Sequence, residues 1–172
     1  SNVLIDYYVA ESFKSLKDER QKNDKKAAQD KKDNPYPTYE DLMKEREESA
    51  AKLVFTIKNS DGEIVRKINK KPSKGVHRLK WDMRYASKDP INLRKSSFYN
   101  PFAGVDESTL VPPGNYTISM SKVYNGDAMP MAGPVEFKVV PLNNTVMPAD
   151  DRKAKAAFQR DIAEFSRKLE GA

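Results

Sequence analysis

Few residues of this chain have the types and the spacing that catalysis requires. The only histidine among the 172 residues is His77, and no pair of acidic residues stands beside it at the spacing of metal ligands. A Ser-His-Asp triad would have to use the same histidine, and no Gly-x-Ser-x-Gly turn marks a nucleophile. We therefore assign His77 a structural or surface role, and we predict no catalytic residue, no metal ligand and no cofactor.

Glycoside hydrolysis needs only two carboxyl groups in the right geometry, which makes Asp82 a candidate. Lys80 and Arg84 flank it on the same face of a predicted strand. Neighbouring cations keep a carboxylate ionised, and a general acid needs the opposite shift. An ion pair between strands is the better prediction for Asp82.

The stretch from Arg66 to Lys80 is basic and contains no acidic residue. It could contact a polyanion, or it could be the solvated outside of a hairpin whose lysines protect a sheet edge from aggregation. The second alternative is favoured, and nucleic acid is not a favoured partner, because the whole chain sets 31 basic residues against 25 acidic ones. The residues that would contact a polyanion are Arg66, Lys67, Lys70, Lys71 and Lys74.

Aromatic side chains in irregular segments are the candidates for binding sugar, because sugar faces stack on aromatic rings. If they are buried instead, they hold the long loops against the core. The tentative glycan contacts are Tyr36, Tyr39, Phe98 and Tyr99.

A predicted β domain positions these side chains. Leu79, Trp81, Met83 and Tyr85 alternate with polar residues, which predicts a strand over residues 75–85 with one buried face. Trp81 is the only tryptophan and would anchor whatever packs opposite. The predicted core consists of Leu53, Phe55, Ile57, Leu79, Trp81, Met83, Tyr116, Ile118, Phe137 and Val139.

Five further strands are predicted from alternation and turn signals, over residues 3–9, 52–58, 63–68, 115–124 and 134–140. The turns at 59–62 and at Asn125-Gly126 indicate hairpins. Six strands in hairpin-rich order predict a mainly β fold, an immunoglobulin-like antiparallel β-sandwich.

Three segments have helical patterns. Residues 11–33 interleave both charge signs and predict a solvated helix. The segment from Thr38 to about Ala51 has a narrow apolar stripe, and we expect it to lie against a sheet edge. Ala154, Phe158, Ile162, Phe165 and Leu169 form the stripe of an amphipathic helix. That stripe must pack on this domain, on a partner helix or on sequence outside the chain.

These elements predict three parts. Residues 1–51 are an N-terminal strand with a helical insertion that packs on the sandwich, residues 52–142 are the sandwich, and residues 143–172 are a C-terminal helix, cut short. No cysteine is present, and no apolar run approaches the roughly 18 residues of a membrane span. We expect no membrane insertion, and the opening Ser1-Asn2 leads us to expect a piece of a longer protein.

Several segments together match one family pattern. Residues 53–68 read as a strand, an Asp-Gly turn and Glu-Ile-Val-Arg. Then follow Lys74-Gly75-Val76-His77-Arg78, Trp81-Asp82-Met83-Arg84-Tyr85 and Pro112-Pro113-Gly114-Asn115-Tyr116-Thr117. This order resembles the immunoglobulin-like domain of flagellar hook-capping proteins. It is more closely similar to the C-terminal region of large exported Bacteroidetes-type proteins with sortilin-like, Asp-box propeller repeats, which are often labelled glycosyl hydrolases.

The resemblance implies export, to the periplasm, the outer surface or the medium, and a propeller domain of the same protein as partner. Any active site would lie on the propeller, and this chain contains no Asp-box, Ser-x-Asp-x-Gly-x-x-Trp. We therefore expect a non-catalytic accessory or structural module and no enzyme activity in the chain itself. The alternatives are a carbohydrate-binding module that uses the loop aromatics, or a polyanion-binding module.

Overall fold

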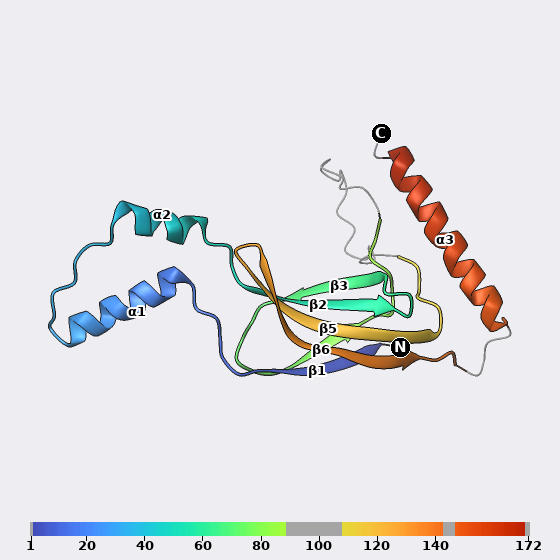
Figure 1. Cartoon of the computed structure of the whole chain (residues 1–172), viewed down its shortest axis with the longest axis horizontal. Coiled ribbons are helices and arrows are strands. Elements are labelled where there is room, and N and C mark those ends of the chain that lie inside the picture. The colour runs from blue at the N-terminus through green and yellow to red at the C-terminus, as the bar shows by residue number, and fades with distance from the viewer. Residues whose placement is uncertain (1, 89–107, 143–146, 171–172) are drawn as a thin grey trace, which may run out of the picture.

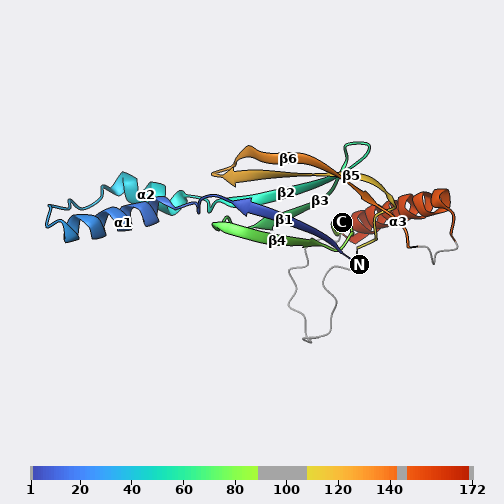
Figure 2. The same ribbon diagram turned by 90° about the horizontal axis from the view of Figure 1, so that it is seen from below.

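The computed structural model describes residues 2–88, 108–142 and 147–170. Within these residues, six strands form two antiparallel sheets of two and four strands, and three helices accompany them. The strands of both sheets run along the long axis of the molecule, and the helices lie toward its two ends (Figure 1 and Figure 2). The fold is therefore a mixture of α and β, whereas the sequence led us to expect a mainly β fold.

The two-stranded sheet joins β1 (Val3–Val9) to β4 (Gly75–Trp81), with Val3 opposite Trp81 and Val9 opposite Gly75. The four-stranded sheet has the order β3-β2-β5-β6. Its strands are β2 (Lys52–Asn59), β3 (Ile64–Lys70), β5 (Gly114–Tyr124) and β6 (Asp127–Val139). Each of the predicted strands is thus present, although several boundaries differ.

The core lies between the two sheets. Alternate side chains of β2 are buried and the others are not, as expected of a strand with one face on a core. Most of the predicted core residues are buried, whereas Met83, Phe137 and Val139 are only partly so. The buried apolar residues are Val9, Leu53, Phe55, Ile57, Val65, Leu79, Trp81, Val111, Tyr116, Ile118 and, on the C-terminal helix, Ala156.

Trp81 joins the two sheets. Its side chain is 1% exposed, and its ring meets the rings of Tyr116 and Phe137 edge-on, at centroid distances of 6.0 Å each. Tyr116 and Phe137 stack on each other at 5.9 Å. The edge-on arrangement places the positive rim of one ring against the negative face of another, which adds to the gain from burial.

The strand predicted over residues 75–85 ends earlier than its alternation predicts. β4 stops at Trp81, and Met83 adopts a left-handed backbone conformation with φ of 57°. The indole nitrogen of Trp81 donates a hydrogen bond to the carbonyl oxygen of Arg84 at 3.1 Å. The chain therefore turns back beneath the tryptophan, because its buried N–H needs an acceptor, and the prediction of a strand to Tyr85 is wrong.

Tyr116 is held by its hydroxyl group as well as by its ring. The hydroxyl donates a 2.6 Å hydrogen bond to the carbonyl oxygen of Pro112, four residues upstream. Burial raises the pKa of this phenol to about 12. The ring is thus fixed at both ends, and the turn before β5 is fixed with it.

The hairpin from β5 to β6 is longer than predicted, because β6 begins at Asp127 directly after the Asn125-Gly126 turn rather than at Pro134. The register shifts near Met120, opposite Ala132. Gly133 follows with φ of +90°, and a Cβ atom there would lie 2.7 Å from the carbonyl oxygen of Ile118. Only glycine fits this close approach of two strands.

Replacing Trp81 with alanine should lower the free energy of unfolding by about 3–5 kcal/mol, because the substitution leaves a cavity where the two sheets meet. Urea unfolding followed by circular dichroism measures the loss. The matched control is Tyr36→Ala, which truncates a ring that is 86% exposed and should leave the midpoint unchanged. Equal midpoints for Trp81→Ala and the unmodified chain would contradict the account of the core.

Candidate functional site

The residues with potential chemistry take structural roles. His77 Nε2 lies 2.8 Å from the carbonyl oxygen of Ser73, and its ring lies 5.4 Å from the ring of Tyr7. Asp82 accepts a hydrogen bond from the backbone N–H of Arg84 at 3.1 Å, within the turn that follows β4. In the described ranges no group of three or more His, Cys, Asp or Glu side chains could hold a metal ion.

The basic residues are spread over β3 and the loop after it. β3 is an edge strand of the four-stranded sheet, the position that the edge-protection alternative requires. Arg66 Nη1 donates a hydrogen bond to the carbonyl oxygen of Tyr85 at 2.8 Å, so this side chain holds the segment after β4 against β3. The side chains of Lys67, Lys70, Lys71 and Lys74 are exposed. Contact with a polyanion stays a prediction.

The predicted glycan contacts are described only in part. Tyr36 and Tyr39 are 86% and 77% exposed, at the N-terminal side of a short helix. Phe98 and Tyr99 lie outside the described residues. The two tyrosines are not needed to hold a loop on the core, and both rings are accessible.

The helical insertion forms an arm that projects from one end of the sheets (Figure 1). α1 (Leu16–Gln29) and α2 (Tyr39–Glu47) lie side by side and have no buried residue between them. α2 contacts α1 through Glu45, and the chain reaches the sheets just after the C-terminal end of α2, where the backbone N–H of Ser49 donates to Asn125 at 2.8 Å. The expectation that this helix lies against a sheet edge is wrong, because its stripe is too narrow to compete with its ionic contacts to α1.

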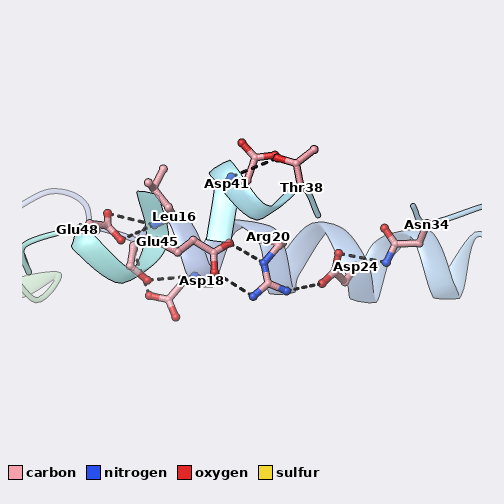
Figure 3. A network of polar contacts seen from close by, with 10 residues as sticks. Leu16, Asp18, Arg20, Asp24, Asn34, Thr38, Asp41, Glu45 and Glu48 are labelled. Carbon is pink, nitrogen blue, oxygen red and sulfur yellow. Dashed lines mark hydrogen bonds and ion pairs between the residues drawn. The ribbon is translucent and has the colours of Figure 1, made fainter. Parts of the chain in front are cut away.

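Those ionic contacts centre on Arg20 (Figure 3). Its guanidinium binds both carboxylate oxygens of Glu45, with Nε 2.6 Å from Oε1 and Nη2 3.0 Å from Oε2. Asp24 on α1 accepts a third bond from Arg20 at 3.3 Å. The bidentate hydrogen bond from Arg20 lowers the pKa of Glu45 below its ordinary value of 4.5.

Glu48 joins the arm to the sheets. One carboxylate oxygen accepts the backbone N–H of Leu16 at 2.9 Å, at the N-terminus of α1, where a negative charge is favoured (Figure 3). The other accepts the hydroxyl of Tyr124, on β5, at 2.6 Å. Arg20, Glu45 and Glu48 were not singled out from sequence, since their partners lie 25 to 76 residues away.

A cavity of ≈ 620 Å³ opens at this junction, beside Phe13, Glu19, Lys74, Lys122 and Tyr124. The ammonium group of Lys122 lies 3.8 Å from the centre of the Phe13 ring and 5.4 Å from that of Tyr124. Because this cation already binds two rings of the protein, we assign the cavity to the attachment of the arm and not to a ligand.

α3 (Ala149–Glu170) turns small and polar side chains toward the loops next to the strands. Ala156 is buried. Arg160 lies 3.2 Å from a carboxylate oxygen of Glu63, and Lys88 lies 3.0 Å from one of Glu164. Hydrogen bonds from Arg167 and then Lys88 lower the pKa of Glu164 to about 2. The guanidinium of Arg160 also lies 5.3 Å from the centre of the Tyr85 ring. In the described ranges, polar and cation–π contacts and one buried alanine therefore attach α3 to the domain.

The opposite face of α3 carries the large apolar residues. Phe158, Ile162, Phe165 and Leu169 are 64%, 48%, 63% and 64% exposed. Of the three partners expected for this stripe, the described part of the domain is thus excluded, and Figure 1 shows α3 standing clear of the strands.

A second apolar surface lies on the open side of the sheets. Val135 of β6 is opposite Ile118 of β5 and shares its face, yet it is 60% exposed while Ile118 is 7% exposed. Among the strands that the structure describes, β1 pairs with β4 alone, and its other edge has no partner strand. Between that edge and β6 lies a groove of ≈ 110 Å³, lined by residues such as Ile5, Tyr7 and Val135.

No protein-family model, curated protein or solved structure matches this chain. The helices that the structure describes include none with the length and apolarity to cross a membrane. The family resemblance therefore stays a proposal, and the two exposed apolar surfaces are the features on which a function can be argued.

Replacing Arg20 with glutamine should separate α1 from α2, because Glu45 loses its bidentate partner. Lowering the pH should have the same effect. The lowered pKa of Glu45 means that the pairing is present at neutral pH and is lost as the pH falls below 4.5 and Glu45 takes up a proton. Spin labels on cysteines introduced at Lys26 and Glu40 would report this as a broader distance distribution.

The control for the arm is Lys25→Gln, which removes the same charge from an exposed position of α1. It should leave the distance distribution unchanged. Identical distributions for Arg20→Gln and the unmodified chain at neutral pH would show that the ion pair does not hold the arm together.

Proposed function

We propose that this chain is a non-catalytic accessory module of a larger exported protein. In this proposal the module has an immunoglobulin-like sandwich and packs beside another domain of the same protein. The family resemblance makes that neighbour a propeller. The observation that carries the proposal is the open side of the sandwich, where Val135 is exposed on the inner face of β6.

Two contacts support the immunoglobulin-like part of the proposal. A buried tryptophan between two antiparallel sheets is a feature of that architecture, and Trp81 has this place. The hydroxyl of Tyr116, near the start of β5, binds the backbone four residues upstream, as in the tyrosine corner of such sandwiches. The small sheet, however, has only two strands, so it covers less of the larger one than a complete sandwich would.

Because the two-stranded sheet covers only part of the four-stranded sheet, the open side favours the docking of another domain over catalysis. The free edge of β1 offers unpaired backbone N–H and C=O groups beside an apolar groove, which is the arrangement that an added strand requires. Val135 lines this groove together with Ala132 and Ile118, and Met129 and Met131, also on β6, are 56% and 49% exposed. An apolar groove beside exposed apolar side chains is typical of an interface. A neighbouring domain would cover it by adding a strand or a flat apolar face.

The module should bind the rest of its protein when the two are produced as separate chains. We expect Val135→Asp to weaken this association at least tenfold, since it buries a charge in the interface. Isothermal titration calorimetry measures the effect. The control is Val76→Asp, on the outer face of β4, where the side chain is already 76% exposed. Equal affinity for Val135→Asp and the unmodified module, or a natural protein with no further domain, would contradict the proposal.

The exposure of Tyr36 and Tyr39 favours a second candidate, a carbohydrate-binding module. The rings lie three residues apart where the chain enters α2, and both are free to stack on a sugar. This function also needs no catalytic group, so it is compatible with the first.

A panel of neutral and acidic polysaccharides, probed at two salt concentrations with DNA as control, tests the second candidate. Saturable binding to a neutral glycan that does not depend on salt and is lost in Tyr36→Ala and Tyr39→Ala would support it. Binding to polyanions alone, weakening steeply from about 50 to 200 mM salt, would favour the basic residues of β3. Absence of any binding would contradict both binding functions.

A further inference from the structure

The stripe on α3 has the spacing of a helix-pairing seam. Phe158, Ile162, Phe165 and Leu169 are separated by four, three and four residues. This is the alternation of the a and d positions of a heptad repeat, which brings side chains into line along one helix face. The contacts with the domain through Ala156, Arg160 and Glu164 leave that face free.

We propose that α3 pairs with α3 of a second copy of this chain, in antiparallel orientation, so that the protein forms a dimer. Two-fold symmetry would set Ile162 of each copy opposite Phe165 of the other, and Phe158 opposite Leu169. Every large apolar residue of the stripe then meets another across the seam.

Charges beside the stripe favour this partner and this orientation. Asp161 and Lys168 are exposed on the same flank of the stripe, one heptad apart. In an antiparallel pair the same flank of both helices meets, and Asp161 of each copy lies within about two residues, roughly 3 Å along the axis, of Lys168 of the other. The dimer would thus contain two symmetric ion pairs. Neither residue forms an ion pair within the described ranges of its own chain.

Parallel pairing lacks this complementarity. It would bring the flank with Asp161 and Lys168 against the opposite flank of the second copy, which carries Gln159 and Ser166 there. Because the stripe and the domain are on opposite faces of α3, antiparallel pairing also places the second domain on the far side of the helix pair. The sheets of the two copies do not compete for the same space.

The available area indicates a reversible dimer. A phenylalanine side chain buries about 150–250 Å², and each copy contributes two phenylalanines, an isoleucine and a leucine that are 48% to 64% exposed. Two copies together would bury about 1,000 Å², near the lower limit for a specific protein interface. Association in the micromolar range is the expectation for such a contact.

Sedimentation equilibrium of the whole chain, over about 1 to 500 µM, tests the proposal in the range where interfaces of this size dissociate. We expect a reversible dimer. Asp161→Lys and Lys168→Asp should each weaken it by about tenfold or more, because each change replaces two attractions with two repulsions. The double variant Asp161→Lys/Lys168→Asp should restore the dimer, since it reverses both partners.

The control is Lys153→Asp, which makes the same charge change as Lys168→Asp at an exposed position outside the seam. It should leave the equilibrium unchanged. A chain that stays monomeric throughout the range, or a double variant no better than the single ones, would overturn the proposal, and the stripe would then belong to another part of the protein. Because the test does not involve Val135, its failure leaves the docking role of the open sheet side standing.

Discussion

The contact between the rings of Trp81, Tyr116 and Phe137 is the interaction on which the rest of the structure depends. Trp81 belongs to the two-stranded sheet, and the other two rings belong to the four-stranded sheet. In the part of the chain that the structure describes, the small sheet pairs with no further strand, and an isolated pair of strands is marginal in water. Tyr7 of β1, at 4.7 Å from Phe55 of β2, adds a second ring contact between the sheets. Packing centred on the buried indole ring therefore joins the two sheets in one core.

The small size of the two-stranded sheet also explains the exposed apolar surface at β6. A two-stranded layer cannot cover four strands, so the side at β6 stays open and Val135 remains accessible. The arm and α3 add little to the core, because they are attached mainly by hydrogen bonds and ion pairs such as Glu48 with Tyr124 and Glu164 with Lys88. Surface ion pairs contribute little stability each. The arm and α3 thus expose their surfaces to solvent, and the core between the sheets supports the elements to which they are attached.

The sequence was a good guide wherever local pattern decides structure. The alternation of apolar and polar residues predicted β2 and β5, and Asn125-Gly126 predicted the hairpin between β5 and β6. Thr38 predicted the start of α2. It failed where distant contacts decide. The turn after Trp81 depends on where its indole N–H finds an acceptor, and the place of α2 depends on Arg20. The spacing of the α3 stripe was visible in the sequence, whereas its outward orientation depends on contacts of the opposite face with distant residues such as Glu63 and Lys88.

We claim that a core between two antiparallel sheets carries elements whose exposed apolar faces bind partners. Hydrogen–deuterium exchange of the whole chain at two protein concentrations tests it most directly. Amides of β2, β4 and β5 should exchange only through global unfolding at either concentration. Those of α3 should exchange rapidly in dilute solution, since a helix with few contacts is marginally stable, and slow down at high concentration. Protection of α3 equal to that of β2 and independent of concentration would contradict the claim.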